Sequence, residues 1–95
     1  MNLKAVYNAL VDPASTFYSG QRPFLFSDST WLGSGHLGAV ALTDMWRDWP
    51  SLRSTISMAM SLSMEGVSNI ASDVCGSLGD MDEELCGRWA QLGAF

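Results

Sequence analysis

The segment between Leu52 and Val74 constrains the fold most strongly, because its apolar residues recur with the spacing of a helix. Residues 56–64 of the same segment also alternate between apolar residues and Ser or Ala, which is the spacing of a β-strand. Met, Ala and Leu favour helices and no β-branched run is present, so we expect one long helix in which Gly66 forms a kink or a point of close approach. The helical stripe consists of Leu52, Ile56, Ala59, Met60, Ser63, Val67, Ile70, Ala71 and Val74.

Two further helices are predicted before that segment. Residues 2–11 carry one apolar stripe of helical period, with Asn2 as the capping residue and Pro13 shortly after the end. Residues 37–49 resume helical spacing. Pro50 either ends this helix or opens the next one at its first position, where proline is tolerated.

A last helix is predicted near the C-terminal end. Asp80 and Glu83 form a capping pair at its start, and Gly93 ends it. Together these patterns predict a mainly α protein, a small bundle of three to four helices in a single domain over residues 1–95. An extended aromatic and Gly-rich segment over about residues 14–36 interrupts the bundle as an irregular arm or loop.

The segment over residues 14–36 mixes Gly and small polar residues with large apolar ones and has no sustained period. Long irregular stretches in compact domains are uncommon and usually functional. The large apolar side chains must therefore be buried either on the protein's own helices or on a partner. They are Phe17, Tyr18, Phe24, Leu25, Phe26 and Trp31.

Charge excludes several classes of partner. Ten acidic and five basic residues give a net charge of −5, and no base lies between Arg53 and Arg88. Nucleic acids and anionic membrane surfaces both require clustered Lys and Arg, so direct binding to either is disfavoured. We find neither a secretory signal nor an apolar run long enough to span a membrane, so we expect synthesis in the cytoplasm.

Few residues offer the means for chemistry. The glycines of residues 33–38 match the GxGxxG pattern, but without a preceding strand they indicate a loop that leads into a helix. Ser34, His36 and Asp44 are the residue types of a catalytic triad, a combination that any chain with one His contains. The acids of residues 80–84 fit a helix start. The sequence therefore predicts no catalytic, cofactor-binding or metal-ligating residue, no cofactor, and no enzymatic activity.

Cys75 and Cys86 are the only cysteines. Two thiols are too few for a disulfide scaffold, and too few for a zinc site without additional ligands. We expect two free, largely buried thiols in a reducing compartment. A bridge between them, across two helices, is sterically conceivable.

The leading hypothesis is a non-enzymatic assembly subunit of a larger oligomeric particle, a virion or phage component that contacts further copies or other protein subunits. A single small core is modest for so many aromatic residues, and oligomer contacts would add stability. The alternative is a small acidic inhibitor or regulator that binds one protein target. The residues expected to bind the partner are Phe24, Leu25, Phe26, Trp31, Trp46, Trp49, Met58, Met60 and Met64.

A third reading comes from a short motif. The run from Trp31 to Gly35, followed by Trp46 and a long helix, resembles the second half of the WXG100 family. That resemblance implies a secreted helical hairpin, usually dimeric, with a Trp-x-Gly turn between two long helices. This sequence departs from the pattern, because Pro13 and Pro23 lie where the first helix should run and the export signal after the second helix is missing.

Overall fold

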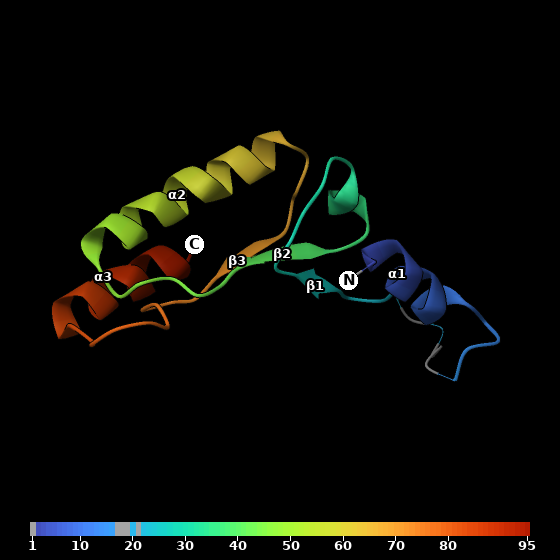
Figure 1. Cartoon of the computed structure of the whole chain (residues 1–95), viewed down its shortest axis with the longest axis horizontal. Coiled ribbons are helices and arrows are strands. Elements are labelled where there is room, and N and C mark those ends of the chain that lie inside the picture. Colours follow the sequence, from blue (N-terminus) through green and yellow to red (C-terminus); the bar gives the residue numbers. More distant parts are fainter. Residues whose placement is uncertain (1, 17–19, 21) are drawn as a thin grey trace.

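The computed structural model describes residues 2–16, 20 and 22–95, in which helices and parallel strands alternate (Figure 1). The molecule is elongated, 49 × 26 × 23 Å, with α1 at one end, beyond β1, and with α2 and α3 toward the other end, where α2 lies beside β3. In chain order the elements are α1 (Leu3–Val11), β1 (Phe26–Ser27), the short 3-10 turn η1 (Ser34–His36), β2 (Ala39–Leu42), α2 (Trp49–Met64), β3 (Ile70–Ser72) and α3 (Glu83–Gly93).

The sheet has the order β1-β2-β3, and both pairs of neighbours are parallel. Phe26 lies opposite Ala39 in the first pair, and Val40 lies opposite Ile70 in the second. The central strand β2 is the most deeply buried, with Ala39 and Val40 only 3% and 5% exposed. A strand of a parallel sheet that is covered on both faces reads as a continuous apolar run, which is the pattern of residues 39–42.

The prediction of a mainly α bundle is wrong, and residues 37–49 account for most of the error. We expected a helix there, whereas Ala39–Leu42 is the central strand and residues 43–48 form a loop. A fully buried strand has no apolar–polar alternation, so it cannot be distinguished from a buried helix by periodicity. Pairing with β1 and β3 decides the structure, and both partners are distant in the sequence.

The long helical stripe is correct in its first part only. Residues 56–64 are helical as expected, and α2 ends at Met64. Gly66 has a φ of +90°, a left-handed conformation that ends the helix and does not kink it. Beyond it the apolar residues continue at helical spacing, but Ile70–Ser72 pairs with β2 as β3.

Both terminal helices are confirmed. Asn2 caps α1, because its side chain accepts a hydrogen bond from the Ala5 amide at 3.3 Å. The cap of α3 is Asp82, whose carboxylate accepts from the Leu85 amide at 3.3 Å, and not the predicted Asp80. In the irregular segment, residues 17–19 and 21 lie outside the described residues, and Phe26 begins a two-residue strand.

The predicted loop into a helix at residues 33–38 is instead a 3-10 turn that leads into β2. Gly35 brings this turn against the end of α2, where a Cβ would clash with the Gly66 carbonyl group and lie 3.0 Å from the Val67 Cα. The absence of a side chain at Gly35 therefore permits this close packing. Among the described residues, we find no helix with the length and apolar character needed to cross a membrane.

Gly35→Ala should lower the free energy of unfolding by about 1–3 kcal/mol, because the added methyl group meets backbone atoms that cannot move aside. The matched control is Gly87→Ala in α3, where a Cβ would meet no atom within 4 Å. Removing glycine from a helix should stabilise the protein by about 0.5–1 kcal/mol. Urea denaturation of the three proteins measures both changes, and equal effects would contradict the close packing at Gly35.

Asp48 should make α2 sensitive to acid. Its side chain accepts from the Ser51 amide at 2.7 Å, and hydrogen bonds with Ser51 lower the pKa of Asp48 below its ordinary value of 3.8. Because the pKa of Asp48 is lower in the folded than in the unfolded protein, its carboxylate stabilises the folded state at any pH above its pKa in the unfolded protein. This stabilisation is lost as the pH falls through its pKa in the folded protein. Asp48→Asn keeps a capping oxygen that does not titrate. Circular dichroism between pH 6 and 2 should therefore show a smaller acid-induced loss of helix in this variant than in the parent.

Candidate functional site

Three acidic residues follow the three strands at the same edge of the sheet. Asp28 comes directly after β1, Asp44 comes two residues after β2, and Asp73 comes directly after β3. Because the strands are parallel, their carboxyl ends meet at one edge. Ligands of open parallel sheets bind outside this edge, so these carboxylates mark the candidate functional site.

Asp44 has the most unusual backbone of the three. Its φ of 56° places it in the left-handed region, where residues other than glycine are uncommon and Asp is among those best tolerated. Such a conformation costs about 1–3 kcal/mol and persists only where the surrounding structure determines it, most often at functional sites. The side chain of Asp44 is exposed, so it is accessible to a ligand.

Asp73 directly follows the neighbouring strand, β3. Its amide donates to the Leu42 carbonyl at 3.1 Å, which extends the pairing of β2 with β3 by one residue. Its own carbonyl accepts from the Gly76 amide at 3.2 Å and so begins a tight turn. These two bonds hold the backbone of Asp73 on both sides, by the sheet and by the turn, and its side chain is half-buried.

Hydrogen bonds join the two loops that carry these acids beyond the ends of the strands. The Met45 carbonyl accepts from the Ser77 and Leu78 amides at 2.9 and 3.2 Å. The Arg47 amide donates to the Leu78 carbonyl at 2.8 Å. We call these two joined segments, residues 43–48 and 73–79, the paired loops.

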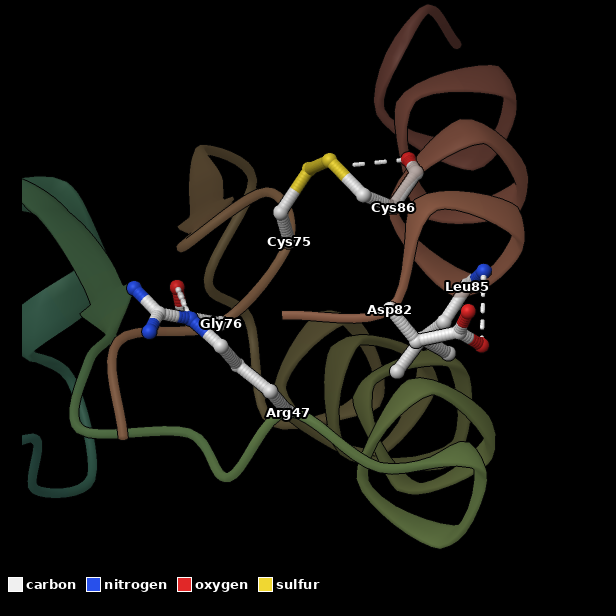
Figure 2. Close-up of a disulfide and its surroundings, with 6 residues drawn as sticks. All are labelled: Arg47, Cys75, Gly76, Asp82, Leu85 and Cys86. Carbon is white, nitrogen blue, oxygen red and sulfur yellow. Dashed lines mark hydrogen bonds between the residues drawn. A yellow bond between two sulfur atoms is a disulfide. The ribbon is translucent and has the colours of Figure 1, made fainter. Parts of the chain in front are cut away.

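The side chain of Arg47 adds further bonds between the paired loops. Its Nε donates to the Gly76 carbonyl at 3.4 Å, and its Nη1 donates to the Gly79 carbonyl at 2.5 Å. Figure 2 shows the side chain extending from its own loop to the Gly76 carbonyl group of the other loop. One residue thus contacts three carbonyl groups of the loop that follows β3.

A disulfide joins the second of these loops to α3. Cys75 and Cys86 are bonded, with their Cα atoms 4.5 Å apart, so the prediction of two free thiols is wrong (Figure 2). Cys75 has a φ of 72° and is, with Asp44, one of two left-handed residues other than glycine in the paired loops. Sequence alone left this bridge open because two cysteines without a known fold give no distance between them.

The nominal triad does not come together. Ser34 and His36 belong to the turn before β2, and Asp44 lies beyond its other end. A four-residue strand separates them by roughly 13 Å along its axis. The Ser34 hydroxyl is occupied in its own turn, 2.6 Å from the Thr30 hydroxyl and 2.8 Å from the Trp31 carbonyl oxygen.

Most residues predicted to bind a partner are exposed, but they do not form one site. Leu25 is buried in the core at 9% exposure, whereas Trp31 and Met64 are more than four-fifths exposed. Trp46 belongs to the paired loops, where it forms an isolated bridge with Leu78. The others lie in or beside β1 (Phe24 and Phe26, whose rings pack edge to face 4.8 Å apart) or on α2 (Trp49, Met58 and Met60). Their role in binding a partner stays a prediction.

Sequence reasoning did not identify the acids at the sheet edge. The signal was present, because the runs Val40-Ala-Leu-Thr-Asp44 and Ile70-Ala-Ser-Asp73 both end a short apolar segment with a small polar residue and an aspartate. Recognising it requires both segments to be strands, and each was predicted as part of a helix.

The comparison with protein families explains this arrangement. All residues of the chain, 1–95, match the model of the glycosyl hydrolases family 31 TIM-barrel domain. The chain belongs to glycosyl hydrolase family 31. The predictions of a non-enzymatic assembly subunit and of a virion component are therefore wrong, and so are the two alternatives, an acidic inhibitor and a WXG100-like hairpin.

Similar proteins are named as glycosidases. The chain is 48% identical to an alpha-glucosidase of Schizosaccharomyces pombe over 75 residues. This match covers 79% of this chain and 8% of that protein. It is 46% identical to an alpha-glucosidase of Hordeum vulgare over 81% of this chain and 9% of that protein. It is 42% identical to alpha-xylosidase 1 of Arabidopsis thaliana over 80% of this chain and 8% of that protein. The chain thus spans less than a tenth of the length of these relatives.

Family membership indicates where this edge of the sheet lies relative to the active site. A TIM barrel has eight parallel strands, and its active site lies at the carboxyl face of the barrel, on the loops that follow the strands. The three strands described for this family 31 chain are part of such a barrel. Asp28, Asp44 and Asp73 follow those strands on the face where the active sites of these barrels lie.

Removing the disulfide should loosen the attachment of α3. The double variant Cys75→Ser/Cys86→Ser should lose about 2–3 kcal/mol of unfolding free energy, because the bridge closes a short loop and constrains the unfolded chain. Urea denaturation with and without dithiothreitol measures this loss. The reductant should destabilise the parent by the same amount and leave the double variant unchanged, and an insensitive parent would contradict the bridge.

Proposed function

We propose that this chain supplies part of the active-site wall of an α-glycosidase, and that Asp44 is one of the carboxyl groups that act on the glycosidic bond. The observation that carries the proposal is the position of Asp44, exposed beyond the carboxyl end of the central strand with a left-handed backbone. Membership of family 31 supports it, because this face of a TIM barrel carries the chemistry.

The reaction needs two carboxyl groups. In most glycoside hydrolases one protonates the leaving oxygen, and the other attacks the anomeric carbon or activates a water molecule. In this proposal Asp44 is one of the pair, and its partner comes from the end of another strand of the barrel, since barrel active sites draw residues from several strands. Asp73, half-buried and directly after the neighbouring strand, accepts hydrogen bonds from sugar hydroxyl groups.

The substrate class in this proposal is an α-linked glucoside. Relatives named alpha-glucosidase support this choice, whereas the relative named alpha-xylosidase acts on a sugar that lacks the hydroxymethyl group of glucose. The two substrates differ at one position of the ring. Assays with p-nitrophenyl α-D-glucoside and p-nitrophenyl α-D-xyloside distinguish them directly.

A chimeric enzyme provides the test of Asp44. The matching 75-residue segment of the Schizosaccharomyces pombe alpha-glucosidase is replaced by the segment of this chain, which places Asp44 in a complete barrel. Asp44→Asn in this chimera should lower kcat by roughly 10²- to 10⁴-fold, the usual contribution of a catalytic acid or base. A chimera in which Asp44→Asn keeps full activity would overturn the proposal.

The leaving group reveals which role Asp44 has. If Asp44 protonates the leaving oxygen, Asp44→Asn should lower kcat/KM much less for a 2,4-dinitrophenyl α-glucoside than for p-nitrophenyl α-D-glucoside. The dinitrophenyl leaving group needs little protonation. If Asp44 is instead the nucleophile or the base that activates water, Asp44→Asn should lower kcat/KM equally for both substrates. The matched control is Glu65→Gln, which removes an exposed carboxylate at the end of α2, before β3, and should leave kcat unchanged.

A further inference from the structure

We propose that Arg47 is a positioning residue that holds Asp44 in its working conformation by fastening the paired loops to each other. This inference rests on the proposed function of Asp44. Arg47 is three residues from Asp44 and contacts the opposite loop through its amide and two side-chain nitrogens.

The guanidinium group suits this task because it presents several donors in a fixed planar arrangement. The Nε and Nη1 atoms donate to carbonyl groups three residues apart, those of Gly76 and Gly79. A lysine carries all its donors on a single nitrogen at the end of a flexible chain, so it cannot place donors on two separate atoms in this fixed arrangement. These two contacts hold the half-buried side chain of Arg47 against the opposite loop.

The opposite loop has a conformation that admits this side chain. Gly76 has a φ of +70°, and a Cβ at this position would lie 3.0 Å from the Cγ of Arg47 and 2.9 Å from the Met45 carbonyl oxygen. Any side chain at Gly76 would therefore separate the loops. The Cys75–Cys86 bridge holds the same loop from its other side, so Arg47 binds to a fixed support (Figure 2).

The contacts of Arg47 transmit this support to Asp44. On one side of Asp44, strand β2 ends at Leu42, whose carbonyl accepts from the Asp73 amide. On the other side, Met45 is bound by the Ser77 and Leu78 amides, and Arg47 completes the attachment. The left-handed backbone of Asp44 is therefore held between two anchored points, as an unfavourable conformation requires.

Kinetics of the chimeric enzyme test the proposal. Arg47→Ala should lower kcat roughly 10- to 100-fold, because small displacements of a catalytic group have effects of this size, while KM changes less than about twofold. Arg47→Lys should recover only part of the loss. The matched control is Arg53→Ala, which removes an exposed arginine of α2 and should leave both constants unchanged. Active-site titration corrects kcat for the fraction of folded enzyme.

Hydrogen exchange on the 95-residue chain gives a readout that needs no activity. The amides of Ser77 and Leu78, which donate to Met45, should exchange at least about tenfold faster in Arg47→Ala than in the parent or in Arg53→Ala. Unchanged exchange at both amides would overturn the positioning role, and so would an unchanged kcat in a chimera that Asp44→Asn inactivates. A chimera that keeps its activity in Asp44→Asn would overturn the proposed function, and this inference with it.

Discussion

Backbone pairing of the central strand β2 is the interaction on which the rest of the structure depends. β2 has only four residues, yet it bonds to β1 on one side and to β3 on the other. Both partners are parallel to it, so all three strands end at the same edge. The same pairing continues past Leu42 through Asp73 and into the paired loops. The sheet and the candidate site are therefore one continuous hydrogen-bonded unit.

This continuity reconciles an exposed carboxylate with a strained backbone. Asp44 is in contact with solvent, where a loop would ordinarily relax into a conformation of lower energy. It is held because its neighbours on both sides are bonded to the loop after β3, and because that loop is bonded to α3 by the disulfide. A rigid support combined with an accessible side chain is what a barrel enzyme needs at the carboxyl ends of its strands.

Sequence reasoning recovered the elements whose stability is local and missed those that depend on distant partners. The helix at residues 2–11 has a cap, an apolar stripe and a proline stop, all readable within a few positions. The strands at residues 39–42 and 70–72 have no such local signal, because pairing between segments far apart in the chain defines them. Asp44 and Asp73 were not recognised as site residues for the same reason. They mark a site only because each follows the carboxyl end of a parallel strand, and neither strand was predicted. The prediction of no enzymatic activity is wrong as well. It was made from short motifs alone, and the acids that mark the candidate site belong to no such motif.

The covalent link between Cys75 and Cys86 also bears on where this fold is stable. Disulfides persist in oxidising surroundings and are reduced by the thiol pools of the cytosol. In a reducing compartment α3 would depend on its buried apolar residues, chiefly Leu85 and Trp89. The loop after β3 would then lose its covalent tether. The redox state of the environment is thereby coupled, through a single bond outside the sheet, to the geometry of the edge that carries the acids.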